Sequence, residues 1–133
     1  MKIEAFLLCD AATDYQGKLN VLGAFDTIFS RKVPIVHPAC AVAARIRFDY
    51  IEQGAHKIKI NVINQDGKAV IPGLDGNLSV AGAGEGGSTA VNLVLNIHGL
   101  KLESYGEYRI DLAVDGRQEG SLPLYVRSAP QHR

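Results

Sequence analysis

The sequence predicts an all-β fold, an antiparallel β-sandwich of about eight strands. Three observations lead to this prediction. Apolar and polar residues alternate along most of the chain, and this period of two places successive side chains on opposite faces of a strand. No apolar stripe with helical spacing continues for three turns. Asp-Gly pairs, which are typical of tight hairpins, stand beside several of the alternating segments.

The N-terminal part of the chain contains two extended segments. Residues 2–10 alternate, but apolar residues stand on both faces, so we expect this strand to be covered on both sides. A turn at 13–17 leads into a long extended run at 18–30. Gly23 lies inside that run. A glycine within a strand indicates a bulge or a bend, as where a strand crosses between two sheets.

The middle of the chain has the clearest alternation. Residues 40–50 carry apolar side chains at even positions, and residues 58–62 repeat the pattern. The link at 51–55 is typical of a hairpin loop, so we expect these two segments to pair with each other. If their apolar faces are to match, paired residue numbers sum to an even value. One such register sets Phe48 opposite Ile58.

The C-terminal half continues the same pattern. Further alternating segments occur at 91–97, 108–114 and 122–126. Turns are expected at the Asp-Gly pairs 66–67, 75–76 and 115–116. Residues 102–105 make at most a single helical turn. We expect one domain over residues 1–127, followed by a flexible polar tail at 128–133.

The glycine-rich segment at 82–88 contains two partial functional motifs. Gly82 to Gly87 fits G-x-G-x-x-G, the spacing of a dinucleotide-binding turn, and the next residues come within one position of the G-x-S-x-G nucleophile elbow. Both motifs require a helix after the glycines. The alternating segment that follows predicts a strand instead. We therefore interpret residues 82–88 as a flexible loop between strands.

Composition and charge argue against several kinds of function. The chain has 133 residues, with 14 Lys and Arg against 14 Asp and Glu, so its formal net charge is zero. Proteins that bind nucleic acid usually carry a basic excess, so nucleic acid is a disfavoured partner. No segment has the apolar length of a membrane span or of an export signal. We therefore expect no membrane contact and a cytoplasmic location.

The cysteines predict buried thiols rather than a disulfide or a metal site. A reducing cytoplasm keeps residues such as Cys9 and Cys40 as thiols. His37 and Cys40 have the H-x-x-C spacing that a metal could use, but the second pair of ligands that a structural zinc site requires is missing. We expect no metal and no cofactor.

One candidate ligand-binding surface is a basic stripe on the outer faces of the two central segments. Its members are Arg45, Arg47, Lys57 and Lys59. In the register given above, Arg47 lies opposite Lys59, and such a like-charge pair requires an anion or a neighbouring carboxylate. The stripe would bind an acidic partner, an anion or a nucleic acid. The alternative, which we favour, is a solvated sheet face that Asp111 or Glu52 partly balances.

An enzymatic alternative is a small hydrolase or carbohydrate-active enzyme. Glycosidase-type catalysis requires two carboxyl groups about 5–10 Å apart across a cleft. Asp10 and Asp26 are the candidate pair, at one end of the sandwich. Aspartates at strand ends more often serve turns, so we assign no catalytic residue.

Residues 105–110 refine the fold class. Their sequence, YGEYRI, places G-x-Y at the start of a late strand. This pattern resembles the tyrosine-corner region of immunoglobulin-like sandwiches, in which a tyrosine hydroxyl bonds to nearby backbone. Tyr108 would hold that place. The sequence thus predicts an immunoglobulin-like sandwich, although the chain has no Trp and so lacks the Cys…Trp…Cys signature of antibody domains.

Four stretches carry a resemblance over most of the chain: LLCDAA at 7–12, GKLNVLGAFD at 17–26, VPIVHP at 33–38 and YGEYRIDLAVDG at 105–116. On these stretches the chain resembles a bacterial family of uncharacterised small all-β proteins. The resemblance implies a common structure and brings no activity, cofactor or site residue with it. We therefore expect a non-enzymatic interaction module. It would bind a protein partner or a second copy of itself through strand edges, the basic stripe or the loop at 82–88.

Overall fold

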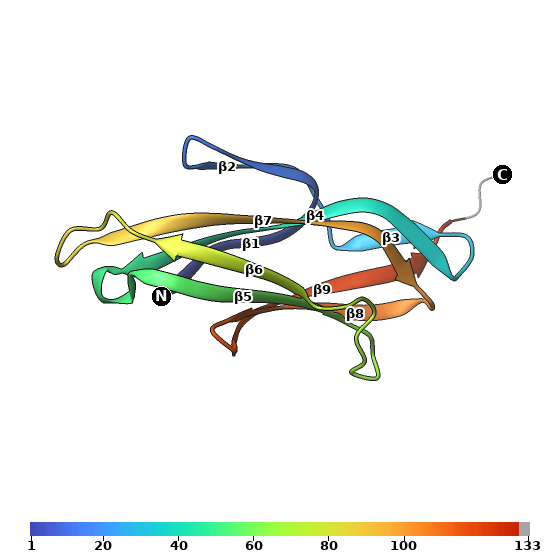
Figure 1. The fold of residues 1–133 in the computed structure, drawn as a ribbon. Helices are drawn as coiled ribbons and strands as arrows, with labels where there is room; N and C mark the ends of the chain where they lie inside the picture. The colour runs from blue at the N-terminus through green and yellow to red at the C-terminus, as the bar shows by residue number, and fades with distance from the viewer. Residues whose placement is uncertain (131–133) are drawn as a thin grey trace.

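A computed structural model describes residues 1–130 and confirms the all-β prediction (Figure 1). The described chain forms two sheets. The first, in spatial order, consists of β2 (Lys18–Ala24), β1 (Lys2–Tyr15), β4 (Ile35–Asp49) and β7 (Ser88–Leu102). The second consists of β3 (Thr27–Ser30), β9 (Arg117–Ser128), β8 (Gly106–Val114), β5 (Gly54–Ile63) and β6 (Leu74–Val80). A short 3-10 turn, η1 (Tyr50–Glu52), joins β4 to β5.

The main core lies between the two sheets. It is built from the alternating faces that the sequence predicts on β4, β5 and β8, together with inward residues of β7 and β9. Phe48 is 1% exposed and packs among these strands, as do Ile60 and Leu112. Cys40 also belongs to this core, and burial raises the pKa of its thiol to about 11. Both cysteines are free and buried, as predicted.

The predicted hairpin at 51–55 is wrong, because this link crosses from one sheet to the other. β4 pairs with β1 and β7, whereas β5 pairs with β6 and β8. The Glu52 carboxylate accepts a hydrogen bond of 2.9 Å from the Asp49 backbone N–H and so closes the turn of η1. Two apolar faces can meet side by side in one sheet or face to face across a core. Periodicity alone does not distinguish these arrangements.

The extended run at 18–30 also changes sheets, as Gly23 indicated. β2 belongs to the first sheet and β3 to the second, where β3 pairs parallel with β9. Gly23 has a φ of +67°, and a Cβ built on it would lie 2.5 Å from a carboxylate oxygen of Asp10. Splitting this run into two strands gives nine strands in residues 1–130 instead of about eight.

The remaining turns are predicted with mixed success. The turn at 13–17 and those at 66–67 and 115–116 are present, each with a glycine at positive φ. The pair at 75–76 lies inside β6 and makes no turn, because Asp75 and Gly76 pair with Lys59 and Ile58 of β5. Residues 104–105 form a bend, which agrees with the limit of at most a single helical turn at 102–105.

A second, smaller core lies on the outer face of the first sheet. The β1–β2 hairpin stands over this face (Figure 1), where Leu19 and Val21 pack against Ala41 and Ala43. Both alanines are at most 1% exposed. Their small side chains let the hairpin approach the sheet closely. Leu8 and Cys9 of β1 are buried in the main and the smaller core respectively, but Leu7 is 37% exposed, so the predicted cover on both sides of residues 2–10 is found only around Leu8 and Cys9.

The tyrosine corner is formed. The Tyr108 side chain is buried, and its hydroxyl donates a hydrogen bond of 2.8 Å to the Ser104 carbonyl oxygen. The same hydroxyl accepts a hydrogen bond of 3.1 Å from the Ser104 backbone N–H. The side chain thereby fixes the corner before β8.

The C-terminal boundary differs slightly from the expected one. β9 continues to Ser128, and the Ala129 backbone N–H bonds to the Ser30 carbonyl oxygen at 3.0 Å. The end of the predicted tail, residues 131–133, lies outside the described residues. Within residues 1–130, no helix has the length and apolar character needed to cross a lipid bilayer.

Candidate functional site

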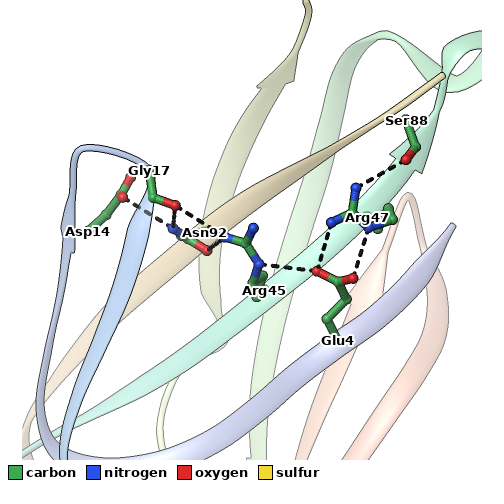
Figure 2. Close-up of polar contacts among 7 residues, drawn as sticks. All are labelled: Glu4, Asp14, Gly17, Arg45, Arg47, Ser88 and Asn92. Atoms are coloured by element: carbon green, nitrogen blue, oxygen red, sulfur yellow. Dashed lines mark hydrogen bonds and ion pairs between the residues drawn. The ribbon is translucent and has the colours of Figure 1, made fainter. Parts of the chain in front are cut away.

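The outer face of the first sheet carries a polar network around Glu4 (Figure 2). Ile3 pairs with Ile46 and Ala5 with Arg45, so Glu4 is the extra residue of a β-bulge. Its carboxylate lies between two arginines of β4. One oxygen is 3.1 Å from Arg45 Nε, and the other is 2.8 Å from Arg47 Nε. The hydrogen bond from Arg47 lowers the pKa of Glu4.

The same network fastens the β1–β2 hairpin to β4 and β7. Arg45 Nη1 donates to the Gly17 carbonyl oxygen at 3.2 Å and to Asn92 Oδ1 at 2.9 Å. Asn92 Nδ2 in turn donates to Asp14 and to the same Gly17 oxygen (Figure 2). Arg47 Nη1 donates to Ser88 Oγ at 3.0 Å. Both arginines therefore hold parts of this chain together.

The basic stripe predicted from the sequence is not assembled. Arg45 and Arg47 lie on the outer face of the first sheet, whereas Lys57 and Lys59 lie on β5 in the second sheet. The predicted pairing of Arg47 with Lys59 is wrong, because β4 does not pair with β5. The carboxylate that balances the arginines comes from Glu4. In the structure, the inward-facing positions of β1 change from odd to even numbers at this bulge, since Ile3 and Phe6 both pack against the main core.

The two candidate carboxylates, Asp10 and Asp26, make different contacts. Asp10 lies beside Gly23, as described above. Asp26 accepts a hydrogen bond of 2.7 Å from Thr27 Oγ1 and lines a cavity of about 400 Å³ with Leu7 and Phe25. Asp10 is not among the residues that line this cavity. The cavity therefore does not join the two carboxylates.

The structure contains a histidine–aspartate pair, His56 and Asp115, that was not predicted from the sequence. His56 Nδ1 lies 2.6 Å from Asp115 Oδ2, and Nε2 contacts the Glu52 carbonyl oxygen. The His56 ring stacks on Phe48 with centroids 4.5 Å apart. The hydrogen bond with Asp115 raises the pKa of His56. Because both ring nitrogens have partners within the protein, the ring acts as a clamp between β5 and the β8–β9 turn.

The glycine-rich segment is a loop between β6 and β7, as predicted. A strand follows it, so the described chain lacks the helix that both partial motifs require. The Gly87 carbonyl oxygen accepts a hydrogen bond of 3.0 Å from the Tyr50 backbone N–H. Gln53 Nε2 donates to the Ala83 carbonyl oxygen at 3.3 Å. The loop thus packs beside η1 at one end of the sandwich.

The free edge of β7 is the candidate interaction surface. β7 is the last strand of its sheet and pairs along 15 residues with β4 alone. Residues 88–97 contain neither a charged residue nor a proline. Val91, Val94 and Leu95 are half-buried, although their partners on β4 have no exposed surface. A further strand beside β7 would bury these side chains.

The other edges in the described chain are protected in ways that proteins commonly use. β3 has only four residues. β2 contains Lys18 and the positive-φ Gly23, and β6 contains Asp75 and Gly76. Such features shorten, bend or charge an edge and so oppose pairing with another strand. In β7 the corresponding residues, positive-φ Gly99 and Lys101, lie beyond residues 88–97 and leave that part of the edge unprotected.

A comparison with known protein families identifies the family of this chain. The model of a family of unknown function, DUF6941, matches residues 4–127. The chain belongs to this family. The DUF6941 match includes all four stretches on which the sequence resembled a family of uncharacterised proteins, and it runs from the first strand to the last. A search of curated proteins and a search of solved structures each found no match.

Proposed function

We propose that this chain is a non-enzymatic, cytoplasmic interaction module of bacteria, with an immunoglobulin-like sandwich fold, and that it pairs with a second copy through β7. The tyrosine corner at Tyr108 supports the fold assignment, because this feature is characteristic of immunoglobulin-like sandwiches. The single observation that carries the function is the uncharged edge of β7 at residues 88–97, with the half-buried apolar side chains described above.

A second copy fits this edge because the segment is complementary to itself. With a two-fold axis through Val94, antiparallel pairing sets Asn92 of one copy opposite Asn96 of the other. Leu93 then faces Leu95 on the core side. No like charges meet within residues 88–97, and the zero net charge of the chain adds no overall repulsion between copies. The two four-stranded sheets would join into one continuous sheet.

Sedimentation analysis over a concentration series tests this proposal. We expect the wild-type chain to form a dimer. Asn96→Lys places a charge in the exposed centre of the edge, and we expect it to weaken the dimer by about tenfold or more, which corresponds to roughly 1.4 kcal/mol. The matched control is Asn20→Lys on β2, the opposite edge of the same sheet, which should leave the dimer unchanged.

Three results would overturn the proposal. A wild-type chain that stays monomeric at every concentration excludes self-association. Equal effects of the two lysine variants would show that any association does not use β7. A dimer that survives Asn96→Lys with unchanged affinity leads to the same conclusion.

A further inference from the structure

A second candidate surface, on the other sheet, is an open depression in the molecular surface. A cavity of about 780 Å³ lies over the outer face of β8 and β9 and beneath the loop that follows β5. Cross-strand pairing sets Arg109 opposite Pro123 and Glu107 opposite Tyr125, and all four residues line the cavity. The pocket thus combines two opposite charges with an aromatic and an aliphatic wall.

A buried carboxylate fixes the orientation of Arg109. The Asp111 side chain is only 8% exposed, although it lies on the outer face of its strand. Its two oxygens accept hydrogen bonds from Arg109 Nε at 2.9 and 3.0 Å. Ser121 Oγ donates to it at 2.8 Å, and Gln118 Nε2 lies at 3.5 Å. With these partners, Asp111 acts as a positioning residue for Arg109 rather than as a ligand contact.

The guanidinium of Arg109 keeps its terminal donors available. Its hydrogen bonds with the described residues use Nε alone, and the side chain is 55% exposed at the cavity. The Nη1 and Nη2 groups carry four N–H donors in a planar fork. This fork matches the two oxygens of a carboxylate.

The loop above the pocket is held close by a glycine. Gly106 has a φ of +131°, and a Cβ built on it would overlap the Gln65 side-chain amide. Gln65 and Asn64 both line the cavity. Because Gly106 has no side chain, the Gln65 amide can lie against β8 and form one wall. This wall supplies both donors and acceptors.

The second charge in the pocket selects among carboxylates. Glu107 and Arg109 are two residues apart on one face of β8, which separates their Cα atoms by about 7 Å. A carboxylate bound by Arg109 therefore has an anionic neighbour, which disfavours a dianion and favours a ligand with its own amine. We infer that this pocket binds a small zwitterion of the amino-acid class, with its carboxylate on Arg109 and its ammonium group toward Glu107.

Titrations of the full chain followed by NMR test this inference. The probes are the common amino acids and, for any that binds, the matching acid that lacks the amine. We expect at least one amino acid to shift the backbone amide signals of β8 and β9. Arg109→Lys keeps a cation beside Asp111 but removes the fork, and we expect it to weaken binding by about tenfold or more.

Two further variants make the result specific. Glu107→Gln should weaken binding of the amino acid but not of the acid that lacks the amine. Arg117→Gln, at the far end of β9 and outside the pocket lining, is the matched control and should bind as the wild type does. The inference is overturned if no amino acid binds at millimolar concentration, if Arg109→Lys binds normally, or if Glu107→Gln affects both ligands equally. None of these outcomes depends on dimerisation through β7.

Discussion

Replacing Tyr108 by Phe removes one oxygen atom and tests the tyrosine corner directly. That hydroxyl makes two hydrogen bonds with the Ser104 backbone, one donated to its carbonyl oxygen and one accepted from its N–H, and the Ser104 hydroxyl lies 3.4 Å away. Both bonds are partly buried, so water does not fully replace them. With a net contribution of about 0.5–1.5 kcal/mol for each bond, we expect the variant to lose about 1–3 kcal/mol of unfolding free energy.

Urea denaturation followed by circular dichroism measures this loss. With an m-value of about 2 kcal/mol per molar urea, the midpoint should fall by about 0.5–1.5 M. Tyr105→Phe is the control, since its hydroxyl also donates to a carbonyl oxygen, that of Ser30 at 2.9 Å, but from an exposed position. Water replaces that bond, so its midpoint should move much less. Equal shifts in the two variants would refute the assignment of a stabilising corner to Tyr108.

Two other predictions concern Gly23, where the chain passes from the first sheet to the second, and the clamp formed by His56. Gly23→Ala should lower the free energy of unfolding by about 1–2 kcal/mol because of its positive φ, and further because the new Cβ would contact Asp10. Gly17→Ala, with φ +77° and open space around it, should lose only the contribution from φ. Equal losses of the two variants in urea denaturation would contradict the contact between residue 23 and Asp10. His56→Gln should cost about 0.2–1 kcal/mol near pH 5.5 and less near pH 9. The raised pKa of His56 makes its contribution complete below its ordinary value of 6.5 and lost as the pH rises through the folded value. The lowered pKa of Asp115 makes its own contribution present above 3.8 and lost as the pH falls through the folded value. A penalty that grows from pH 5.5 to pH 9 would contradict this.

The sequence predicts the strands well because alternation reports directly which side chains face a core. The inward residues of β4, β5 and β8 were identified correctly, apart from Tyr50, which is 42% exposed beyond the end of β4. The change of sheet within residues 18–30 was also anticipated, because Gly23 marks a conformation that other residues adopt at a cost.

Strand partners and the surface sites were not predictable in the same way. The pairing of β4 with β7 joins segments that are distant in sequence, and neither segment contains a pattern that predicts the other as its partner. The expected basic stripe failed for this reason, since it assumed that neighbours in sequence are neighbours in the sheet. Glu4 and Asp111 owe their roles to a bulge and to cross-strand positions. Such features depend on register, which the alternation leaves open.

The order of strands has a consequence during synthesis on the ribosome. Leu102, the last residue of β7, is made about 50 residues after Asp49, the last residue of β4. At translation rates of about 5–20 residues per second, roughly 3–10 seconds pass between the synthesis of β4 and that of β7, the strand that pairs along its whole length. During that time, the apolar strand β4 has one edge without a partner strand in the nascent chain. Chaperone contact or self-association of unfinished chains is therefore to be expected first at β4.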